Sequence, residues 1–111
     1  MSYNVKSISV FEKQAKRLHK KYPSIKLELL ELVKELKENP EQGTAIGKNC
    51  FKIRFAIQSK NKGKSGGARV ITNVLIDKHT VYLLSIYDKG EQETISNKEL
   101  DELLKYVPDD I

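Results

Sequence analysis

Residues 68–89, ARVITNVLIDKHTVYLLSIYDK, contain the pattern that decides the fold. Two stretches rich in Val, Ile, Leu and Tyr, residues 68–77 and 80–89, are joined by the polar turn Asp77-Lys78-His79. β-Branched and aromatic residues favour strands, and a short polar turn between two such runs favours a hairpin. The segment therefore predicts a pair of antiparallel strands.

A third strand is predicted just upstream, at residues 51–58. Apolar residues there alternate strictly with basic or small ones, with Phe51, Ile53, Phe55 and Ile57 on one face and Lys52, Arg54, Ala56 and Gln58 on the other. Alternation of period two is typical of a strand with one buried face. The intervening segment SKNKGKSGG (59–67) is rich in glycine and lysine and is interpreted as a loop.

Helical spacing appears in three other segments. The apolar stripes are Phe11, Ala15, Leu18 and Tyr22; Ile25, Leu29, Leu32 and Leu36; and Leu100, Leu103, Leu104 and Val107. Capping boxes are expected at Ser9/Glu12, which would start the first helix near Val10, and at Ser96/Glu99. Pro23, Asn39-Pro40 and Pro108 end the helices, and residues 39–47 are interpreted as a turn.

With a short strand at residues 5–9, the predicted order is β-α-α-β-β-β-α. This order indicates a single α+β domain spanning residues 1–111, in which a small, mainly antiparallel sheet packs against an N-terminal helical hairpin and a C-terminal helix. A chain of 111 residues is the usual size of one domain.

Charge and composition limit the classes of partner. The net charge is +5, and residues 13–21 contain five basic residues and no acidic one, which favours an anionic partner. No apolar run is long enough to span a bilayer and MSYNVKS lacks a signal-peptide core, so we expect a cytoplasmic protein without a membrane partner. Cys50 is the single cysteine and the two histidines are far apart, so neither a disulfide, a metal site nor another cofactor is expected.

Strand parity gives the sharpest prediction of a site, because side chains two residues apart on a strand share a face. The apolar residues expected to face the core are, strand by strand, Phe51 and Ile53; Val70, Val74 and Ile76; and Tyr82, Leu84 and Ile86. The residues between them must then share one outer face. That face collects Lys52, Arg54, Arg69, Tyr87 and Lys89. This assignment requires a three-residue turn after Ile76, since a two-residue turn would shift the pairing by one.

Several cations around one phenol either form a solvated face or bind an anion, and a phosphodiester suits them because Arg grips two phosphate oxygens and Tyr stacks on a base or exchanges a proton. Crowded cations are also expected to lower the pKa of a neighbouring Lys or Tyr, so that either could act as a base. Further basic residues are candidates for RNA binding: Lys13, Lys16, Arg17 and Lys20 in the first helix, and Lys60, Lys62 and Lys64 in the loop.

These residues carry a family resemblance. FKIRF, GKSGGARVI, LLSIYDKGE and ISNKELDELL, with the helical segments before them, resemble the RelE/ParE superfamily of toxins from type II toxin-antitoxin systems, nearest to its RelE and HigB-like branches. The resemblance implies a small sheet backed by helices and a metal-independent endoribonuclease that cuts mRNA, often on the ribosome, and is silenced by a cognate antitoxin. In such toxins a ribose 2′-hydroxyl attacks the adjacent phosphate and leaves a 2′,3′-cyclic phosphate.

By this resemblance, Lys52 and Arg54 match the paired basic residues of the central strand, Arg69 the arginine after the glycine loop, and Lys89 the basic residue after the last strand. RelE has a tyrosine further downstream, where this chain has Ile95, and Tyr87 takes its place as in HigB-like members. Two other readings stay open: a ParE-like DNA gyrase inhibitor without nuclease activity, and a non-catalytic RNA-binding relative.

Overall fold

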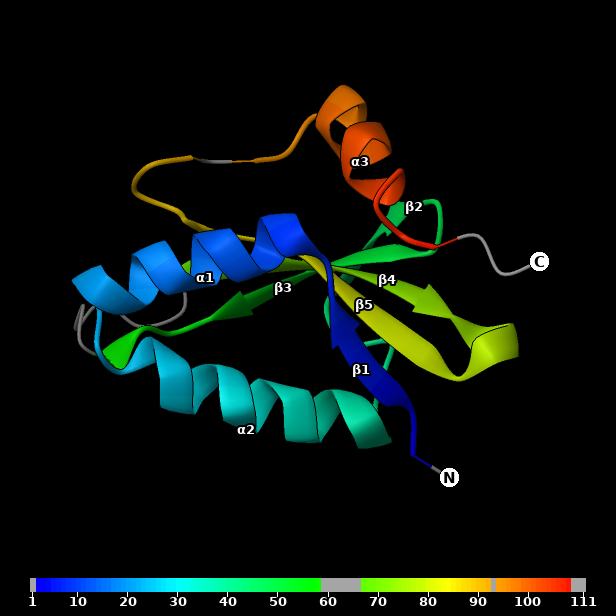
Figure 1. Ribbon diagram of the computed structural model, residues 1–111, viewed down its shortest axis with the longest axis horizontal. Coiled ribbons are helices and arrows are strands. Elements are labelled where there is room, and N and C mark those ends of the chain that lie inside the picture. The colour runs from blue at the N-terminus through cyan, green and yellow to red at the C-terminus, as the bar shows by residue number, and fades with distance from the viewer. Residues whose placement is uncertain (1, 59–66, 93, 109–111) are drawn as a thin grey trace.

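A computed structural model describes residues 2–58, 67–92 and 94–108, which form a central sheet with helices around it (Figure 1). The elements in chain order are β1 (Asn4–Ser7), α1 (Ser9–Lys21), α2 (Ile25–Glu38), β2 (Thr44–Gly47), β3 (Cys50–Phe55), β4 (Ala68–Leu75), the 3₁₀ turn η2 (Ile76–Lys78), β5 (Thr80–Asp88) and α3 (Asn97–Leu104).

The sheet has five strands in the order β1-β5-β4-β3-β2. Only β1 runs parallel to its neighbour, β5, and the other neighbours are antiparallel. The predicted α+β class and mainly antiparallel sheet are therefore confirmed. Within the described ranges, no helix combines the length and apolar character needed to cross a membrane.

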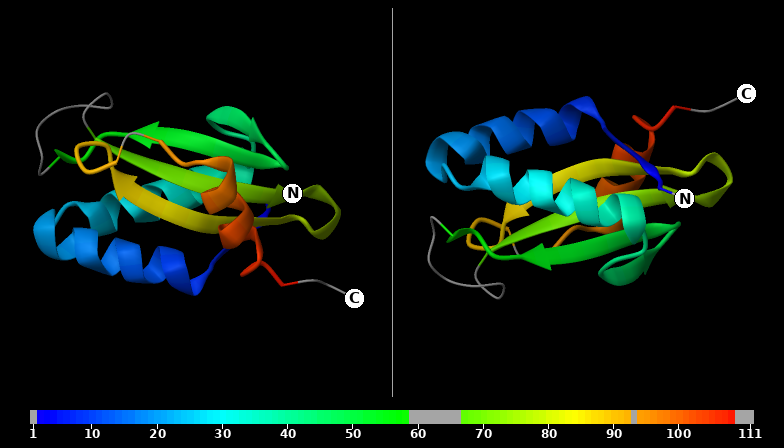
Figure 2. Two further views of the ribbon diagram at one scale, coloured as in Figure 1. Left: turned by 90° about the horizontal axis from the view of Figure 1, so that it is seen from above. Right: turned by 90° about the horizontal axis from the view of Figure 1, so that it is seen from below.

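The helices divide the two faces of the sheet between them. Figure 2 shows α2 against one face and α3 against the other, with α1 running along the side of β5. Because β1 pairs only with residues 80–83 of β5, the second half of β5 is left for α1 to cover. The N-terminal hairpin and the C-terminal helix thus lie on different sides of the sheet.

The core follows the apolar stripes that the sequence indicated. Ile53, Val70 and Ile86 are cross-strand neighbours and are 6%, 0% and 0% exposed. Leu18 of α1 and Ile25 of α2 are also fully buried. Burying one such aliphatic side chain contributes roughly 1.5–3 kcal/mol, so Ile53, Val70 and Ile86 together fix the register of the three central strands.

Several strand bounds differ from the sequence prediction, and β3 ends at Phe55 instead of continuing to residue 58. Residues Thr44–Gly47 form the edge strand β2, although residues 39–47 were interpreted as a turn, and β1 is Asn4–Ser7 instead of 5–9. β2 is short and mostly exposed, so it lacks the alternation by which strands are recognised. Its hairpin to β3 uses positive φ angles at Lys48 (57°) and Asn49 (61°).

The predicted capping box at Ser9 is wrong, whereas the one at Ser96 is confirmed. Helix α1 begins at Ser9 itself, Ile8 is its N-cap without a side-chain hydrogen bond, and Glu12 accepts a bond from the Ser7 hydroxyl at 2.6 Å. In α3 the Ser96 hydroxyl accepts from the Glu99 N–H, and the Glu99 carboxylate accepts from the Ser96 N–H. The spacing S-x-x-E is shared by both, but only Ser96 occupies the N-cap position.

The β4–β5 connection also departs from the expected parity. Ile76 was predicted to face the core but lies in η2 and is 57% exposed, and His79 closes the turn with φ 49°. Ile71 pairs with Ser85 whereas Thr72 pairs with Leu83, so a bulge leaves Leu84 between the partners. Beyond the bulge, Tyr82 pairs with Asn73 and moves to the face that carries Arg69, so its predicted core position is wrong.

Replacing Leu18 by alanine is expected to lower the free energy of unfolding by about 2–5 kcal/mol, because a fully buried leucine leaves a cavity. The control is Leu27→Ala on the outer side of α2, where the leucine is 69% exposed and the loss should stay below about 0.5 kcal/mol. Urea denaturation followed by circular dichroism measures both, and equal losses would contradict the assigned core.

Candidate functional site

Three of the predicted site residues form one row across the central strands. Arg54 of β3 pairs directly with Arg69 of β4, and Arg69 pairs directly with Tyr87 of β5. Directly paired residues project from the same face and have Cα atoms about 4.5–5.5 Å apart. The adjacent row, Lys52, Ile71 and Ser85, lies on this face too, so the predicted grouping of Lys52 with Arg54, Arg69 and Tyr87 is confirmed.

Solvent access changes steeply along the row. Arg54 is exposed and Lys52 half-buried, whereas Arg69 is only 3% and Tyr87 only 4% exposed. The Arg69 guanidinium donates from Nη1 to the carbonyl of Ala68 at 3.2 Å. A charge held away from water acts more strongly on its neighbours, so the field of Arg69 is screened less by water than that of the exposed Arg54.

Tyr87 behaves differently from the sequence expectation. Burial raises the pKa of its phenol and the nearby Glu99 carboxylate also raises it, while the Arg69 cation works in the opposite direction. Desolvation therefore outweighs the cations that were expected to lower this pKa. The buried hydroxyl has no hydrogen-bond partner among the described residues. At neutral pH the Tyr87 hydroxyl thus stays protonated, and it lies buried within the row without a partner among the described residues.

The end of β5 places one acidic side chain on the face opposite the row. The Lys89 N–H donates to the Gly67 carbonyl at 3.1 Å, which continues the ladder just past the row. Asp88 pairs with Ala68 on the opposite, core side of the sheet. There its carboxylate accepts bonds from the Tyr22 hydroxyl at 2.8 Å and the Gly90 N–H at 2.9 Å. The strand therefore directs this acid away from the row.

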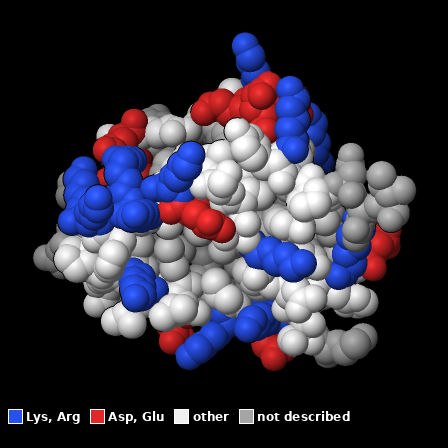
Figure 3. Space-filling model, in the orientation of Figure 1, with Lys and Arg blue, Asp and Glu red and all other residues white. Residues whose placement is uncertain are grey.

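The predicted basic residues of α1 lie together on its exposed side. Lys13, Lys16, Arg17 and Lys20 are all exposed, and Figure 3 shows Lys and Arg side chains gathered over α1. Arg17 is engaged by Glu91 at 3.0 Å, a hydrogen bond that raises the pKa of Arg17 and lowers that of Glu91. Lys60, Lys62 and Lys64 lie outside the described residues. In the described ranges no group of three or more His, Cys, Asp or Glu is arranged to hold a metal ion.

The geometry agrees with a known family. A family model described as the RelE toxin of the RelE/RelB toxin-antitoxin system matches residues 8–108, nearly the whole chain. The chain belongs to the RelE toxin family. The resemblance drawn from FKIRF, GKSGGARVI and LLSIYDKGE is thereby confirmed, and the protein is a toxin of a toxin-antitoxin system.

Solved structures of RelE toxins share the fold. A double arginine-to-alanine mutant of the E. coli toxin RelE in the free state matches with a TM-score of 0.65 at 20% identity, over 97% of this chain and 100% of that chain. The isolated E. coli RelE toxin matches at 0.61 and 19% identity over 96% and 100%. The RelBE2 toxin-antitoxin complex from Mycobacterium tuberculosis matches at 0.59 and 17% identity over 79% and 92%. At such identities these likenesses concern the fold alone.

One feature of this RelE-family toxin was missed by the sequence prediction, a pocket beside the row. Its volume is about 340 Å³, and it lies between Val10 and Gln14 of α1, Ser85 of β5, residues 92 and 95, and α3. The Gln14 amide oxygen accepts from the Ser85 hydroxyl and from the Ile86 N–H, both at 3.0 Å. No local pattern signals this contact, because Gln14 and β5 meet only in the tertiary structure.

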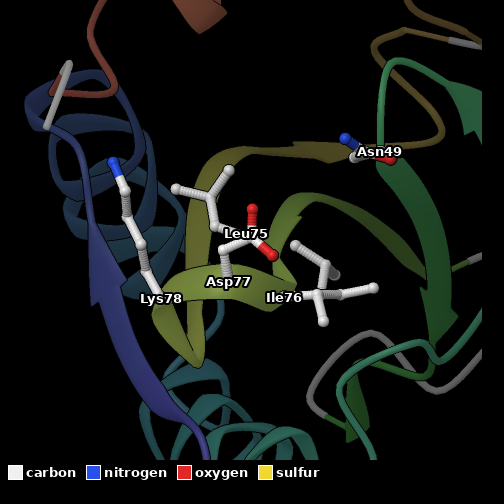
Figure 4. Close-up of a pocket in the computed structure, with 6 residues that line it drawn as sticks. Asn49, Leu75, Ile76, Asp77 and Lys78 are labelled. Carbon is white, nitrogen blue, oxygen red and sulfur yellow. The ribbon is translucent and has the colours of Figure 1, made fainter.

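A second hollow lies at the far end of the sheet. Its volume is about 290 Å³ and Figure 4 shows Leu75, Ile76, Asp77 and Lys78 around the η2 turn, with Asn49 on the neighbouring hairpin. Of the residues that line it, one is cationic and one is acidic. The cations of the row, Arg54 and Arg69, lie instead at the opposite end of β3 and β4.

The raised pKa of Tyr87 predicts a specific pH dependence of stability. A phenol whose pKa is higher in the folded than in the unfolded protein contributes stability that is complete below about pH 10, the unfolded value, and is lost as the pH rises through the folded value. The unfolding free energy of the wild type should therefore fall more steeply above about pH 10 than that of Tyr87→Phe. Urea denaturation between pH 8 and 11 measures this, with the 54%-exposed Tyr106→Phe as the control. Parallel pH profiles for wild type and Tyr87→Phe would contradict the assignment.

Proposed function

We propose that this toxin is an endoribonuclease that cleaves mRNA on the ribosome, by attack of a ribose 2′-hydroxyl on the adjacent phosphate. The observation that carries the proposal is the row Arg54, Arg69 and Tyr87, with Lys52 beside it on the same face. Two guanidiniums and an O–H donor within neighbouring strands match the needs of a phosphodiester that gains negative charge during cleavage. Membership of the RelE toxin family supports the same activity.

The two arginines differ in the role that their exposure allows. Arg54 is exposed and can meet the RNA backbone from solvent, whereas Arg69 is 3% exposed and acts from within the sheet. A guanidinium binds two phosphate oxygens at once, and its charge is worth more where water is excluded. We assign Arg69 to the charge that develops in the transition state, Arg54 to binding of the scissile phosphate, and Lys89 to support at the end of the row.

The reaction also requires two proton transfers. As the 2′-oxygen forms its bond to phosphorus, its proton passes to a base, for which the Lys52 side chain in its neutral amine form, in the adjacent row, is the candidate. As the bond from phosphorus to the 5′-oxygen breaks, that oxygen takes a proton from an acid. Tyr87 is assigned this role because its raised pKa keeps the phenol protonated. The products are a 2′,3′-cyclic phosphate and a free 5′-hydroxyl.

The basic side of α1 is assigned to binding along the RNA or ribosome surface. Lys13, Lys16 and Lys20 are exposed there, and Arg17 is paired with Glu91. The lysines of the segment 59–67 belong to the same proposal by their composition. Regulation is assigned to a cognate antitoxin, since the family model describes a RelE/RelB system and a matched relative is a RelBE2 toxin-antitoxin complex.

Arg69→Ala is expected to lower the rate of mRNA cleavage by about 100-fold or more, because removing one donor that stabilises transition-state charge typically costs that much. The measurement maps new mRNA ends in translating extracts supplied with purified toxin, with and without the cognate antitoxin. Lys34→Ala on the exposed side of α2, remote from the row, is the control and should cleave like the wild type.

If a folded Arg69→Ala protein cleaved mRNA as fast as the wild type, the proposed catalytic role of the row would be contradicted. DNA-damage signalling with intact mRNA would instead favour a ParE-like gyrase inhibitor. RNA binding that arrests translation while all mRNA ends remain intact would favour a non-catalytic relative.

The α1 lysines predict a salt effect that is separate from chemistry. Each phosphate contact to single-stranded RNA contributes about 0.7 to the slope of log affinity against log salt concentration. Lys16→Ala with Lys20→Ala should therefore reduce that slope by roughly 1.4. Arg17→Ala, which removes a side chain already paired with Glu91, should reduce it less. Fluorescence anisotropy with a 2′-O-methyl RNA measures the slopes, and an unchanged slope in the double variant would exclude α1 from the RNA path.

A further inference from the structure

The pocket beside the row has a fixed relation to the proposed site of cleavage. Ser85 lines it, precedes Tyr87 by two residues on β5 and projects from the same face. Two residues along a strand span about 7 Å, so a ligand in the pocket lies next to a phosphate on the row. The lining residues are Val10, Gln14, Ser85, Gln92, Ile95, Lys98, Glu99, Glu102 and Leu103.

Two amides in the pocket are held in defined orientations. The Gln14 oxygen accepts from the backbone N–H of Ile86 at 3.0 Å, and since an N–H can only donate, the amide oxygen must face it. The Gln92 nitrogen donates to the carbonyl of Thr94 at 2.8 Å, and since a carbonyl can only accept, the nitrogen must face it. The pocket is therefore left with the donor end of Gln14 and the acceptor end of Gln92.

The remaining lining disfavours some ligands and favours others. Val10, Ile95 and Leu103 supply apolar walls. Two glutamates, Glu99 and Glu102, outnumber the one cation, Lys98, and therefore disfavour a phosphate. Both carboxylates are oriented by local bonds, Glu99 by the Ser96 N–H at 3.1 Å and Glu102 by Lys105 at 3.1 Å. A suitable ligand is neutral and flat, and its edge carries both donors and acceptors. In RNA that description fits a base.

We propose that this pocket is a nucleobase subsite that receives the base of a nucleotide adjacent to the scissile phosphate, with Gln14 and Gln92 reading its edge between apolar walls. The inference rests on the proposed ribonuclease function, because it takes the RNA to lie along the row. The subsite gives the toxin a means of sequence preference that the cations of the row, which contact only phosphate, do not supply.

The test uses 2′-O-methyl RNA trinucleotides, which lack the attacking hydroxyl, in a complete form and with the base removed at each position in turn. For the wild type, loss of the base at one position should weaken binding roughly tenfold or more. For Gln92→Leu the same base should matter little. Gln42→Leu, in the hollow between α2 and β3, is the matched control and should behave like the wild type. Base removal that costs the same in wild type and Gln92→Leu at every position would overturn the proposal.

A second measurement does not depend on a variant. In NMR spectra of the wild type, the side-chain amide resonances of Gln14 and Gln92 should shift with the complete trinucleotide and stay in place with the one lacking the decisive base. Resonances that move equally with both would also overturn the subsite. Because these RNAs cannot be cleaved, the binding result is independent of the cleavage result. If binding depends on one base but mRNA is not cleaved, only the proposed nuclease activity is contradicted. If mRNA is cleaved but binding depends on no base, only the proposed subsite is contradicted.

Discussion

The packing of Ile53, Val70 and Ile86 across three adjacent strands is the constraint on which the rest of the structure depends. These side chains are buried on one face, and a slip of one residue in any strand would move that strand's apolar set to the opposite face. The next row along the strands must then project to the opposite face. The placement of Arg54, Arg69 and Tyr87 side by side is thus a consequence of core packing, and the core stabilises what would otherwise be a repulsive arrangement of cations.

Solvent exposure decreases along the row from Arg54 to Arg69 and Tyr87, and the sequence alone does not show this. Arg54 is in solvent, Arg69 is almost fully covered, and Tyr87 is buried enough that desolvation sets the direction of its pKa shift. Water screens the electrostatic interactions of a charge at the exposed end, whereas at the buried end these interactions are screened less. A phosphate approaching from β3 would therefore move from a region suited to capture into one suited to stabilising developing charge.

The peripheral helices add to this sheet in different ways. α1 supplies Gln14, whose amide oxygen accepts a hydrogen bond from the backbone N–H of Ile86, at a part of β5 that does not pair with β1. α3 approaches from the other side, where its carboxylates meet the end of the pocket. Together they turn a flat sheet face into a recess bounded by amides, carboxylates and apolar walls. The basic side of α1 remains outside this recess, exposed to solvent.

The sequence by itself determined the fold class, the helical stripes such as Phe11 and Leu18, and the shared face of Lys52, Arg54, Arg69 and Tyr87, because alternation and helical spacing are local properties of the chain. Only the tertiary structure decided the edge strand β2, the exposure of Ile76 and the position of Tyr82 beyond the bulge. Each of these depends on a partner strand or on the geometry of a turn, and the residue types alone do not specify either. The same holds for the pKa of Tyr87 and for the contact of Gln14 with β5. Desolvation and long-range contact arise from how much of the chain surrounds a group in space, and that is established only when elements distant in sequence pack together.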